Sequence, residues 1–327
     1  MMNSKYNCSK HLGTLNLKDM GSFHVGGKNV SVNGKEPYLI NVNNNCDRQI
    51  SIDPNGIYIL GQMYAQYYIP QNQKSSFPLL LWHGGGMTGK AYETTPDGRT
   101  GWLNYFIRCG WKSYLCDSVE RGRSGWVPYV EEFNDQPTLF NKTYIFERFR
   151  LGETIEKGLF LKSQFPMEAY DMYAKEFVPR WTTTSELMIE AYCALLKKVG
   201  PSVIIGHSQG ATLAFDIAEH YPELIKALVL IEPYGAGSSN SFSTLKNIPI
   251  FWIFGDYINL HHDWAKAKSV AEEYCRKFSQ NGGDGKLLDL PAAGIYGNTH
   301  MMMMEKNNLQ IADFIQDWLI DHKLCQL

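Results

Sequence analysis

The most informative chemical pattern in the chain is Gly206-His207-Ser208-Gln209-Gly210. It directly follows an apolar run at 203–205 and precedes a segment at 211–220 that we predict to be helical. Between a strand and a helix, a G-x-S-x-G pattern forms a strained turn that exposes the serine hydroxyl. The pattern alone is weak evidence, but this setting makes Ser208 the candidate nucleophile.

A serine hydroxyl becomes a good nucleophile only when a base takes its proton and a carboxylate orients that base. In turns of this type the three groups follow the order serine, acid, histidine along the chain. His300 fits as the base, because it lies after the last apolar run, 287–290, and before the final helical pattern. We therefore predict that Ser208 and His300 act together.

Two residues compete for the role of the acid. Glu232 ends the apolar run 227–231, and Asp256 follows the later run 250–254. The more common acid follows the later run, as the second acidic residue of a G-[D/E]-x-D pattern, but that position here is Ile258. We favour Glu232, whose extra methylene group would help it reach the histidine, and keep Asp256 as the alternative.

An oxyanion that forms during acyl transfer needs backbone N–H donors. One donor would be Gln209, the residue after the nucleophile, and another would come from the loop His83-Gly84-Gly85-Gly86. We predict Gly85 as the donor, with its two glycine neighbours as alternatives, and expect His83 to brace the loop. The glycine spacing fits neither a dinucleotide-binding turn nor a phosphate-binding loop.

Short apolar runs alternate with helical patterns along most of the chain, which predicts a mostly parallel, doubly wound sheet. A capping box at 183–186 would begin one helix, and an apolar stripe from Ile311 to Leu319 marks the last one. Residues 50–68 are rich in β-branched and aromatic residues around a turn at 53–56. We predict antiparallel edge strands there. The expected core strands are 77–82, 113–116, 203–205, 227–231, 250–254 and 287–290.

One long aromatic stretch, from Trp126 to Trp181, interrupts the alternation. Inserted stretches of this length are usually functional or have structure of their own. We predict a single domain over 1–327 with a helical cap insertion at 126–182; an ordinary peripheral helical layer is the alternative. Residues that could line a substrate pocket, although such residues are more often core, are Trp102, Trp126, Phe165, Trp181 and Met301.

Composition excludes several other classes of function. The 327 residues include 31 basic and 33 acidic side chains, which argues against a nucleic-acid partner bound by bulk charge. Seven cysteines without a CxxC pair favour reduced thiols.

No apolar run approaches the roughly 20 residues that span a bilayer, and no leader is recognisable, so we expect a cytoplasmic location unless a leader was trimmed. The neighbouring His261 and His262 lack a third ligand, so we expect no metal.

Several stretches together resemble a branch of bacterial α/β-hydrolase esterases. They are HGGGMTGKAYETTPDGRTGWLNYF, DSVERGRSGW, GHSQG, VLIEP, FGDY and GNTHMMMMEKNNLQIADFIQDWL, and the similarity runs from about Met20 to Leu319. The resemblance implies the α/β-hydrolase fold and a triad of Ser208, Glu232 and His300. It also implies hydrolysis of small-molecule carboxylic esters without metal or organic cofactor, and a homodimer. One relative carries two cysteines where this chain has Gly85-Gly86.

Other outcomes stay open at the level of sequence. The same triad could cleave lactones, amides or carbon–carbon bonds, and a noncatalytic binding protein of the same fold is a further alternative. In the TPDGRTGW segment, Asp97 and Arg99 could form a bracing ion pair, or Arg99 could bind a substrate carboxylate. The natural substrate, its chain length and its stereochemistry are not readable from the residues.

Overall fold

The centre of the molecule is a twisted sheet. Within residues 2–44, 47–237 and 241–327, which the computed structural model describes, this sheet has eight strands in the order β1-β4-β6-β5-β7-β8-β9-β10. Its strands are β1 Leu17–Val32, β4 Gly56–Pro70, β5 Leu79–Trp82, β6 Ser113–Asp117, β7 Ser202–His207, β8 Ile225–Ile231, β9 Ile250–Phe254 and β10 Gly285–Asp289. Strands β5 to β10 run parallel, whereas β1 and β4 are antiparallel to their neighbours. The predicted mostly parallel sheet with antiparallel N-terminal strands is confirmed.

Two helical layers cover the sheet. Helices α1 and α8 pack on the face that receives Leu79 and Leu81, and α4, α5 and α7 pack on the face that receives Leu80 and Trp82. Because both faces are covered, every residue of β5, β6, β7 and β9 is buried, as their apolar sequences predict. The α-helices of these layers are α1 Trp102–Arg108, α4 Ser185–Val199, α5 Gln209–His220, α6 Phe242–Leu245, α7 His262–Gln280 and α8 Asn308–Asp321.

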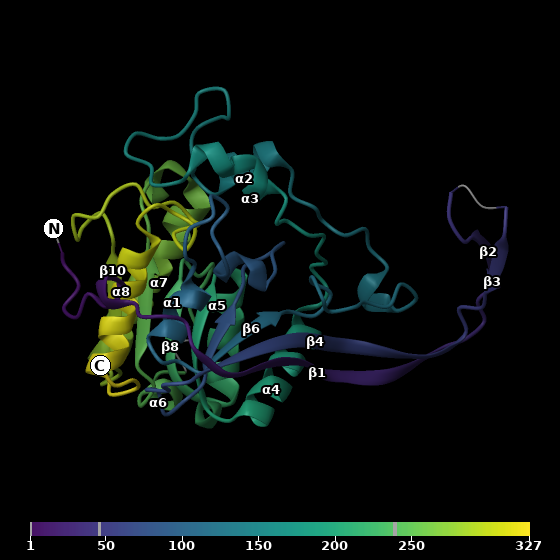
Figure 1. The fold of residues 1–327 in the computed structure, drawn as a ribbon, viewed down its shortest axis with the longest axis horizontal. Helices are drawn as coiled ribbons and strands as arrows, with labels where there is room; N and C mark the ends of the chain where they lie inside the picture. The colour runs from purple at the N-terminus through teal and green to yellow at the C-terminus, as the bar shows by residue number, and fades with distance from the viewer. Residues whose placement is uncertain (1, 45–46, 238–240) are drawn as a thin grey trace.

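The N-terminal strands form a long antiparallel arm that projects from the body (Figure 1). A second small sheet at its end pairs β2 Tyr38–Asn41 with β3 Gln49–Ile52. The prediction for residues 50–68 was partly wrong, because the turn near residue 54 links two separate hairpins. β3 pairs with β2, and the partner of β4 is β1, whose many polar residues and glycines gave no strand signal.

The capping box predicted at 183–186 does not form. Helix α4 has Thr184 at its N-cap, and no side chain caps the helix there. The Thr184 hydroxyl instead donates to Glu120 Oε1 at 3.3 Å, and the Thr183 hydroxyl donates to the Glu132 carbonyl at 2.6 Å. Both hydroxyls therefore bond to groups distant in the sequence and do not cap the helix terminus.

Residues 126–182 form short helical pieces joined by irregular chain. Their helices are η3 Glu131–Phe133, α2 Lys142–Arg148, η4 Met167–Ala169 and α3 Tyr170–Ala174. The segment bonds to residues that follow two different strands, β5 and β10: Val178 N donates to the Gly86 carbonyl at 2.9 Å, and Phe149 O accepts from His300 N at 3.2 Å. It therefore covers the carboxyl ends of the strands, where Figure 1 shows α2 and α3.

Further short 3₁₀-helices are η1 Cys8–His11, η2 Gly89–Tyr92, η5 Pro222–Leu224 and η7 Ile258–Leu260. No helix in the described part of the chain is both long enough and apolar enough to cross a membrane. The cysteines in that part are free thiols, as expected, and Cys46 lies outside the described residues.

Candidate active site

Ser208 occupies a sharp turn between β7 and α5. Its φ of 52° and ψ of −115° are unfavourable for a residue with a side chain, so the surrounding packing must impose them. A Cβ atom at Gly206 would lie 2.7 Å from Ala211 Cα, and one at Gly210 would lie 2.6 Å from the Trp82 carbonyl oxygen. Both glycines are thus needed for the close approach of strand and helix that positions Ser208.

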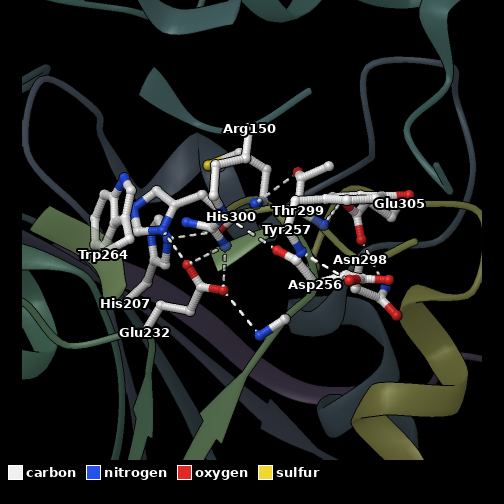
Figure 2. Close-up of polar contacts among 12 residues, drawn as sticks. Arg150, His207, Glu232, Asp256, Tyr257, Trp264, Asn298, Thr299, His300 and Glu305 are labelled. Atoms are coloured by element: carbon white, nitrogen blue, oxygen red, sulfur yellow. Dashed lines mark hydrogen bonds and ion pairs between the residues drawn. The ribbon is translucent and has the colours of Figure 1, made fainter. Parts of the chain in front are cut away.

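His300 and Glu232 form a buried hydrogen-bonded pair (Figure 2). His300 Nδ1 lies 2.6 Å from Glu232 Oε2, and both side chains are fully buried. Glu232 Oε1 also accepts from Gly255 N at 2.8 Å, and Arg150 Nη2 lies 2.6 Å and 2.8 Å from the two carboxylate oxygens. The carboxylate is therefore satisfied on every side.

The charges of this pair follow from their surroundings. Burial alone would raise the pKa of Glu232, but the positive charge of Arg150 and the contact with His300 outweigh it and lower that pKa to about 2. Burial lowers the pKa of His300, and the nearby carboxylate opposes that shift only in part. Glu232 is thus anionic and His300 neutral near pH 7. His300 Nε2 has no hydrogen-bond partner among the described residues, so this ring atom is free to act as a base.

Asp256, the alternative acid, does not contact the histidine ring. Its Oδ2 accepts from Gly297 N at 3.0 Å and its Oδ1 accepts from Tyr257 N at 2.7 Å, while its own N–H donates to the Asn298 carbonyl at 2.6 Å. The structure brings Glu232 to His300 and leaves Asp256 to brace the loop that carries the histidine.

Two further residues, which the sequence reasoning missed, fix this loop (Figure 2). Glu305 is fully buried and accepts from Thr299 N at 2.5 Å and from Asn298 Nδ2 at 2.6 Å. Burial raises the pKa of Glu305 to about 7. On the other side, His207 Nε2 donates to the His300 carbonyl at 2.9 Å. Neither role has a local sequence signal, because each depends on which backbone groups the fold brings nearby.

The glycine loop after β5 lies against Ser208. A Cβ atom at Gly84 would lie 3.2 Å from Ser208 Cβ, and both Gly85 and Gln209 line the same cavity as Ser208. His83 braces the loop as expected: its Nδ1 donates to the Gly84 carbonyl at 2.9 Å and its Nε2 accepts from Ser118 N at 3.0 Å. Burial, with the nearby charge of Arg121, lowers the pKa of His83 to about 4, so the ring is neutral.

A cavity of about 410 Å³ opens beside Ser208. Its aromatic lining is Phe140, Tyr144, Phe149, Tyr234 and Trp264. The remaining lining residues are Gly85, Arg148, Arg180, Ser208, Gln209 and Thr212. A pocket of this size and composition suits a small organic substrate.

None of the five residues expected to line a substrate pocket is among these lining residues. Trp102 is fully buried and donates from Nε1 to the Asn308 carbonyl at 3.0 Å, and Phe165 and Met301 lie in the same core cluster. Trp126 packs against Trp181 with ring centroids 4.8 Å apart. Their large side chains fill the interior or stabilise the segment over the sheet.

Three arginines lie in or near the site: two of them brace other groups, and one lines the cavity. Arg99 pairs with Asp97 at 2.5 Å and donates to the Met304 carbonyl at 2.8 Å, so it braces a loop, as the first of the two interpretations held. Arg150, from the 126–182 segment, supports Glu232. Arg180, from the same segment, lines the cavity. The sequence analysis singled out neither Arg150 nor Arg180.

Comparisons with known proteins agree on the type of fold. A family model described as "alpha/beta hydrolase fold" matches residues 161–259. A protein named "Probable secreted lipase phiG", from Fungal sp. (strain ATCC 74256), is 26% identical over 79% of this chain and 85% of its own length. A solved structure described as a novel bacterial esterase is 33% identical, covers 95% of this chain and 98% of its own, and superposes with a TM-score of 0.84.

Proposed function

The chain belongs to the α/β-hydrolase superfamily, and from this premise we propose that it is a serine esterase that cleaves carboxylic esters through an acyl-enzyme intermediate. The observation that carries the proposal is the 2.6 Å contact between His300 Nδ1 and the Glu232 carboxylate, beside a serine held in a strained turn. The names of the two relatives, esterase and lipase, support the same class of reaction.

The first half of the proposed reaction acylates the enzyme. His300 Nε2 accepts the proton of the Ser208 hydroxyl while Ser208 Oγ forms a bond to the ester carbonyl carbon. The N–H groups of Gln209 and Gly85 donate to the oxyanion that results. When the intermediate collapses, the bond to the alkoxy oxygen breaks, and His300 gives its proton to the departing alcohol.

The second half releases the acid. His300 accepts a proton from a water molecule as that water attacks the acyl carbon, and the bond to Ser208 Oγ then breaks as the proton returns to the serine. Glu232, ionised because its pKa is about 2, keeps the Nδ1–H tautomer of His300 in place and stabilises the imidazolium that forms in each half. The hydrogen bonds that Arg150 Nη2 and Gly255 N donate to Glu232 keep that carboxylate anionic.

We also propose that residues 126–182 act as a cap within a single domain. Five of the cavity's lining residues belong to this segment: Phe140, Tyr144, Arg148, Phe149 and Arg180. The cap would thus shape the pocket, whereas the sheet supplies the reacting groups. The fungal relative's name calls that protein secreted; for this chain a cytoplasmic location and a homodimer remain predictions.

The test is hydrolysis of 4-nitrophenyl esters with acyl chains of increasing length by the wild-type protein and by Ser208→Ala. We expect the variant to lose at least about three orders of magnitude in kcat while it keeps its circular dichroism spectrum. Ser279→Ala, a change on the exposed face of helix α7, is the matched control and should keep full activity. Substantial hydrolysis by Ser208→Ala would overturn the proposal.

A further inference from the structure

The cavity beside Ser208 carries an unbalanced positive charge. Two arginines, Arg148 and Arg180, line it, and no aspartate or glutamate is found among the described lining residues. Arg148 already has a counter-ion, since its Nη1 lies 3.0 Å from Asp263 Oδ2, and its guanidinium also lies 4.9 Å from the ring centre of Trp264. Arg180 is therefore the residue whose charge needs explaining.

The Arg180 side chain forms no hydrogen bond or ion pair with any residue that the structure describes, and its Nε is buried without a partner. Glu120 is the carboxylate that attracts the Arg180 guanidinium. It is already paired with Arg121, however, and accepts a hydrogen bond from Trp181 N at 3.3 Å. Burial, with the added repulsion from Arg121, lowers the pKa of Arg180. The free protein thus holds a guanidinium where its charge is unfavourable, which a bound anion would relieve.

The position of this guanidinium ties it to the reacting groups. A Cβ atom at Gly85 would clash with Arg180 Nη1 and lie 3.4 Å from Gln209 Oε1. The guanidinium therefore occupies the space that the missing side chain of Gly85 leaves open, next to the two proposed oxyanion donors. A group bound to Arg180 would lie close to the ester carbonyl that Ser208 attacks.

We propose that the substrate carries a free carboxylate in addition to its ester, and that Arg180 binds this carboxylate. The planar guanidinium can donate two parallel hydrogen bonds to a carboxylate, which is the geometry that arginine recognises best. The aromatic side chains of the cavity would cover the rest of a short, monoanionic ester. This inference rests on the proposed esterase function and specifies its substrate class.

The experiment compares anionic esters with neutral esters of the same shape. Monoethyl glutarate and ethyl 5-methylhexanoate place the carboxylate, or an isopropyl group of similar size, on the acyl side. Carboxymethyl acetate and isobutyl acetate do the same on the alcohol side. Hydrolysis of each is followed by pH-stat titration, and the quantity compared is the ratio of kcat/KM for the anionic and neutral members of a pair.

We expect the wild-type enzyme to prefer the anionic member of at least one pair. The pair that shows this preference tells whether the substrate carboxylate lies on the acyl side or on the alcohol side of the ester. Arg180→Gln should lower that ratio by about 10- to 100-fold, the usual range for a lost charge-assisted hydrogen bond. Arg276→Gln, on the exposed surface of helix α7, is the matched control and should leave the ratio as in wild type. A wild-type preference for the neutral members of both pairs, or a ratio that Arg180→Gln does not change, would overturn the inference.

The two proposals fail in different ways. If the wild-type enzyme cleaves neutral esters but the ratio contradicts the expectation, the esterase proposal stands and the carboxylate site falls. If it cleaves no ester of either pair, hydrolysis of the 4-nitrophenyl esters decides about the esterase proposal, and binding of glutarate measured by isothermal titration calorimetry decides about Arg180. Binding that Arg180→Gln removes and Arg276→Gln keeps would support the anion site; equal or absent binding in wild type and Arg180→Gln would overturn it.

Discussion

Arg150→Met tests the electrostatic support of Glu232. Arg150 Nη2 lies 2.6 Å and 2.8 Å from the two oxygens of Glu232, and both side chains are buried. Burial would raise the pKa of this carboxyl, yet Arg150 and His300 lower it to about 2 from its ordinary value of 4.5. By linkage this difference is worth roughly 3 kcal/mol of stability near pH 7. Because the folded-state pKa is the lower one, this stability is present above pH 4.5 and is lost as the pH falls towards 2.

Methionine keeps much of the length of Arg150 but removes its charge. Glu232 would then stay buried with only the Gly255 N–H and His300 as partners. Removal of one partner from a buried ion pair typically costs about 3–5 kcal/mol, which agrees with the linkage value. We therefore expect Arg150→Met to lower the free energy of unfolding by about 3 kcal/mol or more at pH 7. The loss should be smaller at pH 4, where the carboxyl of the variant is more easily protonated.

Urea unfolding at pH 7 and pH 4, followed by tryptophan fluorescence, measures both effects. Arg276→Met, which breaks an exposed pair with Glu273, is the control and should change the free energy of unfolding little. In a Glu232→Gln background, Arg150→Met should cost much less, because no buried charge is left unpaired. An equal cost in both backgrounds, or a loss that does not depend on pH, would refute the reasoning.

Three further predictions concern the proposed acid Glu232, the proposed base His300 and the loop that carries His300. Glu232→Gln should lower kcat by about a thousandfold or more, whereas Asp256→Asn should cost far less; equal losses in steady-state assays would contradict the assignment. Since burial lowers the pKa of His300, the acid limb of kcat/KM against pH should lie below pH 6.5 and move lower still in Glu232→Gln; a limb above pH 6.5 would contradict this. Burial raises the pKa of Glu305 to about 7, so roughly 3 kcal/mol of stability is present below pH 4.5 and lost as the pH rises through 7. Glu305→Gln should flatten the change of the urea midpoint between pH 5 and pH 8, and an unaltered slope would count against it.

The sequence predicted the parts of the molecule that have local signals. Continuous apolar runs predicted the buried parallel strands, because a strand covered on both faces needs apolar residues at every position. The strand-turn-helix setting predicted the turn at Ser208, and chain order then narrowed the histidine to His300. The choice between Glu232 and Asp256 was harder, because both follow a strand, and it depended on the residue type at position 258.

Long-range partners had no such signal. Arg150 meets a carboxylate 82 residues away, and Arg180 lies between Pro179 and Trp181 in the long aromatic stretch, where nothing local marks it as a cavity residue. The aromatic side chains of residues 126–182 illustrate the same difficulty, since Phe140 lines the cavity while Phe165 lies in the core. Residue type alone cannot separate these two outcomes; only the path of the chain does. Strand β1 was missed because its glycines and polar residues suit an exposed antiparallel arm rather than a buried strand.

The most direct test of the central claim is covalent labelling of the purified protein with a fluorophosphonate, located by peptide mass spectrometry. We predict one adduct per chain, on Ser208, absent from Ser208→Ala and formed far more slowly in His300→Ala, because the serine hydroxyl is then without its base. Labelling at another residue, or an unchanged rate in His300→Ala, would contradict the account.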